Sequence, residues 1–338
     1  MRSLPLAAAP ASHGGPRPSR RHVVLAGAAT LAAPLAWAQP GFPSKPLTLI
    51  VPFTAGGASD VGARMLGTEL GKLLGQTVVV ENLAGAGGAL AVQKLIRAPA
   101  DGHTLLYGGM SETLLVPLIN PSLGYKPEDL LPVALAGSSP ILFVVRPEFP
   151  ANTMDELVAL VRKNPGKYSF GSAGIGSFAH VMGEVVKERA GMFMVHIPYR
   201  GGQQIITDVI GGQLDMGITT AANAASMIAN KRIKALGVSA GERVPVIKDV
   251  PTFSESNALK GLQMSVWAFV YAPNNTPAAV VERLNTAINT ALMVPALKEA
   301  RVRLASDLPS LMTPAQSRAF IAAEQALYKP VTSRIKPE

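Results

Sequence analysis

The chain has 338 residues, of which 48% are hydrophobic and 16% are charged, so it can bury the core of one large or two medium domains and is not a disordered chain. Cysteine is absent, which excludes disulfide bonds, thiolate nucleophiles and cysteine metal ligands. The formal net charge is +9, but beyond residue 38 the basic residues are scattered and do not cluster with aromatic residues, so we predict no nucleic-acid partner.

Residues 1–38 are typical of a cleavable export signal. A pair of arginines precedes an apolar run that begins at Val23, and Ala36 and Ala38 are the small residues that signal peptidase requires. We therefore predict cleavage after Ala38 and export to the periplasm, with Sec and twin-arginine export both open. A permanent membrane anchor is disfavoured because Pro34 interrupts the run, which is shorter than the ~20 residues of a spanning helix.

From residue 46 onward, short β-rich runs alternate with helical patterns. The predicted strands are 46–52, 77–81, 104–107, 141–145, 168–171, 193–197, 214–218 and 233–238. The predicted helices are 61–74, 89–97, 154–164, 178–190, 203–210, 224–230 and 278–292, and the chain after Pro277 is mostly helical. This alternation indicates two α/β units with largely parallel sheets.

Three glycine-containing loops lie where a predicted strand ends and a helix begins. They are residues 51–60, 171–177 and 198–202. Loops at this edge of parallel strands collect ligand-binding groups, and the first N–H groups of a helix attract anions because they lack intrahelical partners. Residues 55–57 are therefore a candidate carboxylate site. A second interpretation stays open, in which the glycines only form a tight turn and Ser59 or Asp60 only caps the helix.

The motifs of nucleotide-binding proteins and of common enzymes are absent. Residues 171–177 read G-x-x-G-x-G and not the dinucleotide pattern G-x-G-x-x-G, and no Gly-Lys-Ser/Thr follows residues 85–88. No H-E-x-x-H or G-x-S-x-G motif occurs. We therefore predict a protein that is not an enzyme, with no catalytic residue, no metal and no cofactor. His180 is a candidate ligand contact because its helix begins at the second glycine loop.

These features together resemble a known family, the extracytoplasmic receptors of tripartite tricarboxylate transporters, also called Bug receptors. The resemblance covers nearly the whole chain after the export signal. The segments that carry it are 42–46 (FPSKP), 50–57 (IVPFTAGG) with Asp60, 75–76 (GQ), 79–82 (VVEN), 85–88 (GAGG), 100–105 (ADGHTL), 171–177 (GSAGIGS) with His180, 198–199 (PY) with Gly201, and Asp208 with 211–215 (GGQLD).

The resemblance implies a type II periplasmic binding protein fold, which is an α/β fold with two lobes, two crossover strands and a central ligand cleft. Residues 44–140 and 268–338 would form lobe 1, and residues 141–267 lobe 2. It further implies a receptor that captures a small carboxylate by closure of its lobes and passes it to the membrane subunits of a transporter. We expect a monomer. Two alternatives stay open: a sensor that signals to a membrane partner, and an enzyme that uses His180 with Asp60 or Asp208.

The resemblance also implies which residues bind the ligand. Relatives hold a carboxylate through backbone amides and ordered waters at the first glycine loop, and the second and third loops contribute from the other lobe. Thr219 and Thr220 stand where many relatives have an acidic or amide residue, which argues against an amino-acid ligand, and Ser111-Glu112 replaces a Thr-His pair. The candidate ligand-binding residues are Phe53, Thr54, Ala55, Gly56, Gly57, Asp60, Ser111, Ser172, Gly174, Gly176, Ser177, His180, Gly201 and Thr219.

Overall fold

Nine strands in the described part of the chain form two sheets that share one long strand. The strands are β1 (Leu47–Val51), β2 (Val78–Asn82), β3 (Thr104–Gly109), β4 (Leu130–Val145), β5 (Ser169–Ser172), β6 (Val195–Pro198), β7 (Met216–Thr220), β8 (Lys234–Val238) and β9 (Ser265–Pro273). The first sheet has the order β2-β1-β3-β9-β4, and in the second sheet β8 and β7 flank β4, followed by β5 and β6. The computed structural model describes residues 41–199, 201–303 and 311–335, so the predicted export signal lies outside the described residues.

Each sheet contains a group of three neighbouring strands that run parallel. In the first sheet β1 pairs in parallel with β2 and β3, and in the second sheet β5 pairs in parallel with β6 and β7. Strands β4, β8 and β9 pair antiparallel with their neighbours, apart from an isolated parallel bridge between β8 and Thr252. The predicted α/β fold is therefore confirmed. The prediction of largely parallel sheets holds for the pairings among β1, β2 and β3 and among β5, β6 and β7, and it is wrong for β4 and β8, which pair antiparallel.

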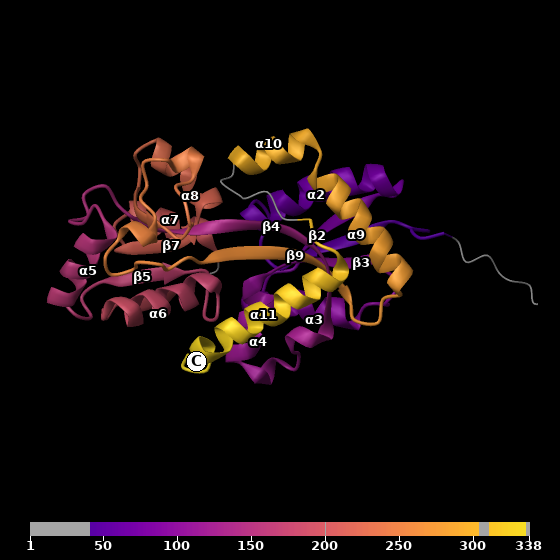
Figure 1. Ribbon diagram of the computed structural model, residues 1–338, viewed down its shortest axis with the longest axis horizontal. Helices are drawn as coiled ribbons and strands as arrows, with labels where there is room; N and C mark the ends of the chain where they lie inside the picture. The colour runs from indigo at the N-terminus through magenta and orange to yellow at the C-terminus, as the bar shows by residue number, and fades with distance from the viewer. Residues whose placement is uncertain (1–40, 200, 304–310, 336–338) are drawn as a thin grey trace, which may run out of the picture. The chain divides into compact units, whose positions relative to one another are not determined.

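Strand β4 has 16 residues because it passes from the first sheet into the second. It pairs with β9 as far as Pro140, and from Ile141 it pairs with β7 and β8. Figure 1 shows β4 and β9 running side by side between the two sheets. Only residues 141–145 were predicted as a strand, because Pro132, Gly137 and Pro140 interrupt the β pattern before them and two register shifts occur there.

The helices cover both faces of the sheets, and most of them bury apolar side chains against the strands. Helix α5 illustrates the local causes: Thr153 caps its first turn, acidic residues follow in that turn, and basic residues end it. The helices are α2 (Ala58–Leu74), α3 (Ala89–Arg97), α4 (Val116–Ile119), α5 (Met154–Lys163), α6 (Phe178–Ala190), α7 (Gly202–Ile210), α8 (Ala221–Ala229), α9 (Ala278–Leu292), α10 (Pro295–Arg303) and α11 (Pro314–Thr332), with short 3₁₀ turns and a π-helix, η2 (Ser111–Leu115).

The hydrophobic core consists of three clusters, and their arrangement positions the site. The largest cluster is continuous between the two sheets and includes residues of α3, α5, α6 and α11. The second cluster packs α2 and α9 on the first sheet, and the third packs α7 and α8 on the second sheet. On the side of α2 and α7, the core is therefore divided in two. Among the described residues, none of the helices is both long enough and apolar enough to cross a membrane.

Candidate functional site

A pocket of about 540 Å³ lies where the second and third core clusters remain separate. Its walls are the beginning of α2 from the first sheet and the beginnings of α7 and α8 from the second sheet. Its floor comprises residues of the two crossing strands, including Gly137, Ser139 and Ala268. The pocket therefore collects the strand-to-helix loops of both sheets, which is the place where α/β folds bind ligands.

The first glycine loop leaves the beginning of α2 open. Gly57 is the N-cap of this helix, and no side chain caps it. Gly56 has φ +85°, a conformation that favours glycine, whereas Gly57 has φ −78°, which any residue can adopt. Because the first N–H groups of a helix have no intrahelical acceptor, α2 presents backbone donors to the pocket. These donors and the helix dipole favour an anion.

Asp60 does not line the pocket but stabilises the first glycine loop through a hydrogen bond. Its carboxylate accepts hydrogen bonds from Gly56 N (2.9 Å) and Arg64 Nε (3.1 Å). Burial raises the pKa of Asp60, but the hydrogen bonds from Arg64 and Gly56 outweigh burial, and the pKa is lowered overall. Asn82 completes the support, because it accepts from Arg64 Nη2 and donates to the carbonyl oxygen of Phe53. The loop is thus fixed at both ends before any ligand arrives.

The third glycine loop gives α7 a similarly open beginning. Gly201 is the N-cap of α7, and no side chain caps that helix either. Next to it, Thr219 Oγ1 accepts a hydrogen bond from Asn223 Nδ2 (3.3 Å), so the Thr219 hydroxyl retains a proton to donate. A Cβ atom added at Gly202 would lie 2.4 Å from Asn223 Nδ2 and 3.0 Å from Thr219 Oγ1, so a larger residue there would displace the Asn223 side chain. Two uncapped helices, α2 and α7, therefore open onto one pocket.

The second glycine loop is different, because its donors already have partners. Ser177 caps α6 and accepts from the N–H of His180, and Ser111 Oγ accepts from the N–H of Phe178. The N–H of Gly176 donates to Nδ1 of His180. Of this loop, Ala173 and Ser177 line the pocket. The loop therefore anchors α6 to the segment after β3 and offers few groups to an anion.

His180 stacks on His196 with ring centroids 3.9 Å apart and an interplanar angle of 7°. His196 Nε2 lies 2.6 Å from Ser172 Oγ, so Ser172 is part of this buried group. Burial, together with the smaller electrostatic effects of His180 and Lys187, lowers the pKa of His196 to about 3. The His196 ring is thus neutral at physiological pH and acts as a packing and hydrogen-bonding group.

The structure brings most of the predicted site residues together. The predicted residues that line the pocket are Phe53, Thr54, Ala55, Gly56, Gly57, Ser111, Ser177, Gly201 and Thr219. Those outside its lining are Asp60, Ser172, Gly174, Gly176 and His180. Each of these five hydrogen-bonds to the loops that form or flank the pocket, so they are placed to support a ligand site.

Two buried ionisable residues that the sequence did not indicate as site residues also line the pocket. Glu112 is 0% exposed, and its Oε1 accepts a hydrogen bond from the N–H of Gly109. Its Oε2 has no hydrogen-bond partner among the described residues. Burial raises the pKa of Glu112 to about 8, so the side chain is a neutral acid at pH 7 and can donate a proton to a ligand oxygen.

Arg301 of α10 is the second such residue. Its side chain is 8% exposed, and Nη2 donates to the carbonyl oxygen of Ala136 in β4. Its Nη1 has no hydrogen-bond partner among the described residues, and burial lowers its pKa. No sequence signal pointed to Arg301, because it lies on a polar helix far along the chain from every glycine loop. Its place at the pocket depends on tertiary packing alone.

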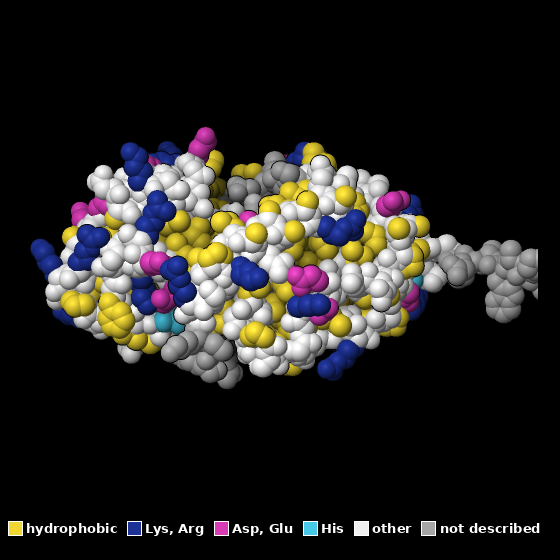
Figure 2. Space-filling model, turned by 60° about the horizontal axis from the view of Figure 1, so that its bottom comes forward, with side chains coloured by type: hydrophobic (Ala, Val, Ile, Leu, Met, Phe, Trp, Pro, Cys, Tyr) yellow, Lys and Arg dark blue, Asp and Glu magenta, His cyan; other side chains and the backbone are white. Residues whose placement is uncertain are grey.

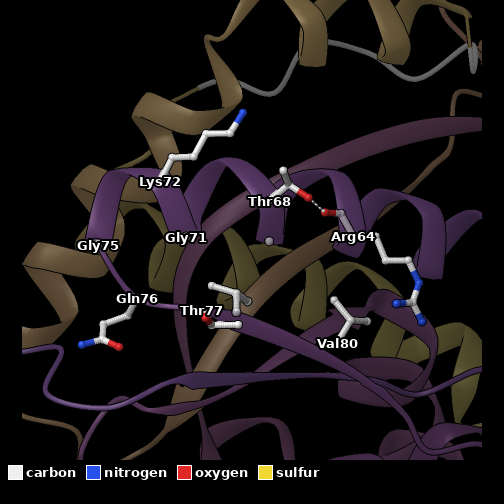
Figure 3. A pocket seen from close by; sticks show the side chains of 10 residues that line it. Arg64, Thr68, Gly71, Lys72, Gly75, Gln76, Thr77 and Val80 are labelled. Carbon is white, nitrogen blue, oxygen red and sulfur yellow. Dashed lines mark hydrogen bonds between the residues drawn. The ribbon is translucent and has the colours of Figure 1, made fainter.

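A second hollow, of about 720 Å³, lies along the outer side of α2 beside the edge strand β2 (Figure 3). It exists because Gly67 and Gly71 leave room for Val78 to pack against the helix. Its charged side chains, Arg64 and Lys72, point away from each other in Figure 3, and none of the predicted site residues lines it. Without convergent polar groups, this furrow is a consequence of helix-on-strand packing and not a ligand site.

The chemistry that the pocket can perform is recognition of an acidic group. It combines backbone donors of α2 and α7, the Thr219 hydroxyl, a neutral Glu112 and the cation of Arg301. No group of three or more His, Cys, Asp or Glu side chains within residues 41–199, 201–303 and 311–335 is arranged to hold a metal ion. Figure 2 shows Lys and Arg side chains spread over one face of the molecule, with acidic side chains among them.

Comparison with known proteins gives a consistent result. Residues 62–336 match the family described as tripartite tricarboxylate transporter family receptor. A protein of Pseudomonas sp. strain P51, encoded in the tcbD-tcbE intergenic region, is 38% identical over 301 residues, which cover 86% of this chain and 89% of that protein. MatC from Rhodopseudomonas palustris, solved with bound malate, is 30% identical with a TM-score of 0.80, and the match covers 86% of this chain and all of MatC. The periplasmic binding protein BugD is also 30% identical with a TM-score of 0.80 over 88% of this chain and all of BugD, which confirms the predicted fold.

Proposed function

Because the chain belongs to the tripartite tricarboxylate transporter receptor family, we propose that this solute-binding receptor captures a small carboxylate in the pocket between its two sheets. The first carboxylate group of the ligand binds residues 54–57 and the first N–H groups of α2, apart from the N–H of Gly56, which donates to Asp60. The Gly201 end of α7 and the Thr219 hydroxyl bind from the opposite wall. The observation that carries this proposal is that two uncapped helices open onto one pocket.

The geometry supports this assignment over a purely structural role for the loop. Other helices of the second sheet are capped by a side chain, as α6 and α8 are by Ser177 and Thr220. Glycine at the N-caps of α2 and α7 leaves their first donors without a side-chain partner. Such donors cost about 1 to 3 kcal/mol each when buried and unpaired. A bound carboxylate satisfies them in the closed protein.

Capture proceeds by closure of two lobes, residues 44–140 with 268–338 and residues 141–267. The separation of the second and third core clusters supports this motion, because the walls of the pocket belong to different clusters. Among the described strands β4 alone pairs in both sheets, and β9 accompanies it as far as the Pro140–Ser265 pair, so bending is expected near Pro140 and Ser265. A ligand that contacts both walls binds the closed state more tightly and shifts the population toward it.

The receptor works in the periplasm and delivers its ligand to the membrane subunits of a transporter. The family match supports this role, as does the signal-like sequence of residues 1–38. MatC was solved with malate, a small carboxylate, which supports the ligand class. The protein itself makes and breaks no bond.

The test is a ligand screen on the purified protein without residues 1–38. Thermal shift against mono-, di- and tricarboxylates, amino acids and sugars should reveal stabilisation by at least one carboxylate and none by sugars. Isothermal titration of the best acid should give one site per chain and no turnover when the ligand is recovered. A protein that no carboxylate stabilises, or that converts the acid into a product, contradicts the proposed function.

A further inference from the structure

Arg301 carries a buried positive charge that no acidic side chain of the described residues neutralises. Nη2 donates to the carbonyl oxygen of Ala136, and Nη1 has no hydrogen-bond partner within the described ranges. A Cβ atom added at Gly137 would lie 2.7 Å from Nη1, so this nitrogen lies directly over the Gly137 backbone, which lines the pocket. Taking a guanidinium out of water without a partner is strongly unfavourable, so an anion that reaches Nη1 is favoured there.

The position of Arg301 relative to Glu112 follows from the strand register. Gly109 of β3 pairs with Ala268 of β9, which pairs with Gly137 of β4. Directly paired residues present their side chains on the same face of a sheet. A Cβ added at Gly109 would lie 3.4 Å from Glu112 Oε1, and one added at Gly137 would touch Arg301. The Glu112 and Arg301 side chains therefore lie on the same face of the sheet. They lie over β3 and β4, which are two strand spacings, or about 10 Å, apart.

The first loop lies at the Glu112 end of this row. A Cβ added at Gly88 would lie 2.7 Å from Glu112 Cβ and 3.2 Å from Pro52 Cβ, so Glu112 is close to the chain that enters residues 53–57. Arg301 and Leu297, one turn apart on α10, form the other end of the pocket. The pocket thus has one acid-binding end at α2 and Glu112, and a cationic end at Arg301.

We propose that the ligand is a dicarboxylate whose second carboxylate binds Arg301 Nη1, so that Arg301 is the residue that distinguishes dicarboxylates from monocarboxylates. This inference rests on the proposed function, because it assigns the second end of the same pocket. Ala268, between the two ends, presents only a methyl group and leaves room for the carbon chain of the ligand. The guanidinium forms charge-assisted hydrogen bonds that a monocarboxylate cannot reach from the first loop.

The first experiment uses the unaltered protein without residues 1–38 and three matched probes: succinate, butyrate and succinamic acid. They share a four-carbon chain, and the last replaces one carboxylate by a neutral amide. Isothermal titration should give an affinity for succinate about 10- to 100-fold higher than for the other two, because a hydrogen bond to a buried charged group is lost. Malate and longer α,ω-dicarboxylates, each with its monocarboxylate, extend the series if succinate is too short. Equal affinity for every matched pair overturns the proposal.

The second experiment changes the protein. Arg301→Met should lower dicarboxylate affinity to the level of the matched monocarboxylate and leave monocarboxylate affinity within about twofold. Arg301→Lys, which keeps the charge but loses the planar donors, should give an intermediate loss. Arg283→Met, at an exposed position of α9, is the matched control and should change neither affinity. Equal loss for both ligand classes in Arg301→Lys would mean that Arg301 only supports the fold and would overturn the proposal.

The two proposals fail in distinguishable ways. If no carboxylate binds the unaltered protein, the proposed function is wrong. Only the role of Arg301 is wrong if carboxylates bind but a dicarboxylate binds no more tightly than its matched monocarboxylate. The same holds if Arg301→Met keeps the higher affinity for the dicarboxylate. Circular dichroism and thermal unfolding of each variant confirm that it is folded before its affinities are compared.

Discussion

The Asp60 carboxylate accepts a hydrogen bond from the backbone N–H of Gly56 at 2.9 Å, across the turn that begins α2. This bond ties the first helical turn back to the glycine loop. It explains why Asp60 belongs to the same sequence segment as the loop without lining the pocket. Asp60 also pairs with Arg64 at 3.0 Å, and Arg64 reaches Asn82, so the loop is held by side chains from α2 and β2. A rigid loop loses less conformational entropy when a ligand binds.

Asp60→Asn should therefore weaken ligand binding without unfolding the protein. The amide keeps the shape but loses the charge that pairs with Arg64, and we expect a loss of about 1 kcal/mol in the free energy of unfolding, because Arg64 is half exposed. Carboxylate affinity should fall by about tenfold as the loop becomes less ordered. Urea unfolding and titration calorimetry measure the two effects. Glu69→Gln, which removes a surface pair with Lys72, is the control and should alter neither.

Glu112 should make the protein progressively less stable as the pH rises from about 4.5 to about 8. Its pKa is about 8 in the folded protein against an ordinary 4.5, because burial disfavours the charged form. Between these values the unfolded chain has released the proton and the folded chain retains it, so stability decreases with increasing pH, by up to about 1.4 kcal/mol per pH unit. Glu112→Gln should remove this decrease. Chemical unfolding at several pH values between 5 and 9, compared with Glu81→Gln at a more exposed position, checks it. An unchanged pH profile in Glu112→Gln contradicts the burial of a neutral acid.

His196 should act in the opposite direction at lower pH. The pKa of His196 is about 3 in the folded protein and 6.5 in its ordinary range. Between these pH values His196 is protonated in the unfolded chain but not in the folded chain. The contribution of His196 to stability is thus complete above pH 6.5 and is lost as the pH falls toward 3. His196→Gln, which can still bond to Ser172, should unfold less steeply on acidification. An acid-unfolding profile parallel to that of the unaltered protein would show that His196 charges freely in the folded state.

Individual helices and strands were predictable where the hydrophobic periodicity agrees with the glycine and proline residues that mark the ends of an element. Helix α3 was predicted over residues 89–97, as observed, because its buried residues recur at helical spacing and a glycine turn precedes it. Strand β1 was predicted to within one residue at each end, since it is a continuous apolar run between prolines. Strand β9 received no predicted range, because its identity depends on pairing with two strands that are distant in the sequence.

The site could be predicted in part. The glycine loops carry a local signal, since glycine between a strand and a helix marks an open helix start. The two buried ionisable residues, Glu112 and Arg301, carry no such local signal in the sequence. Glu112 follows Ser111 in an apolar segment whose π-helical turn is not evident in the sequence, and Arg301 lies on a polar helix whose sequence reads as surface. Both become part of the pocket only through the pairing of β3, β9 and β4, which is a property of the whole fold.

The most direct test of the account is carboxylate titration of Gly57→Asp. Gly57 has φ −78°, and a Cβ there would meet only Thr54 O at 3.7 Å, so aspartate fits without strain. Its carboxylate would accept the free N–H groups of α2 as an N-cap, occupying the ligand's place and repelling a second anion. Thr77→Asp, which adds the same charge at the other end of α2, is the control. We predict that Gly57→Asp unfolds at the same or a higher temperature and binds carboxylates at least about 100-fold more weakly, while Thr77→Asp binds normally; undiminished binding by Gly57→Asp would contradict the account.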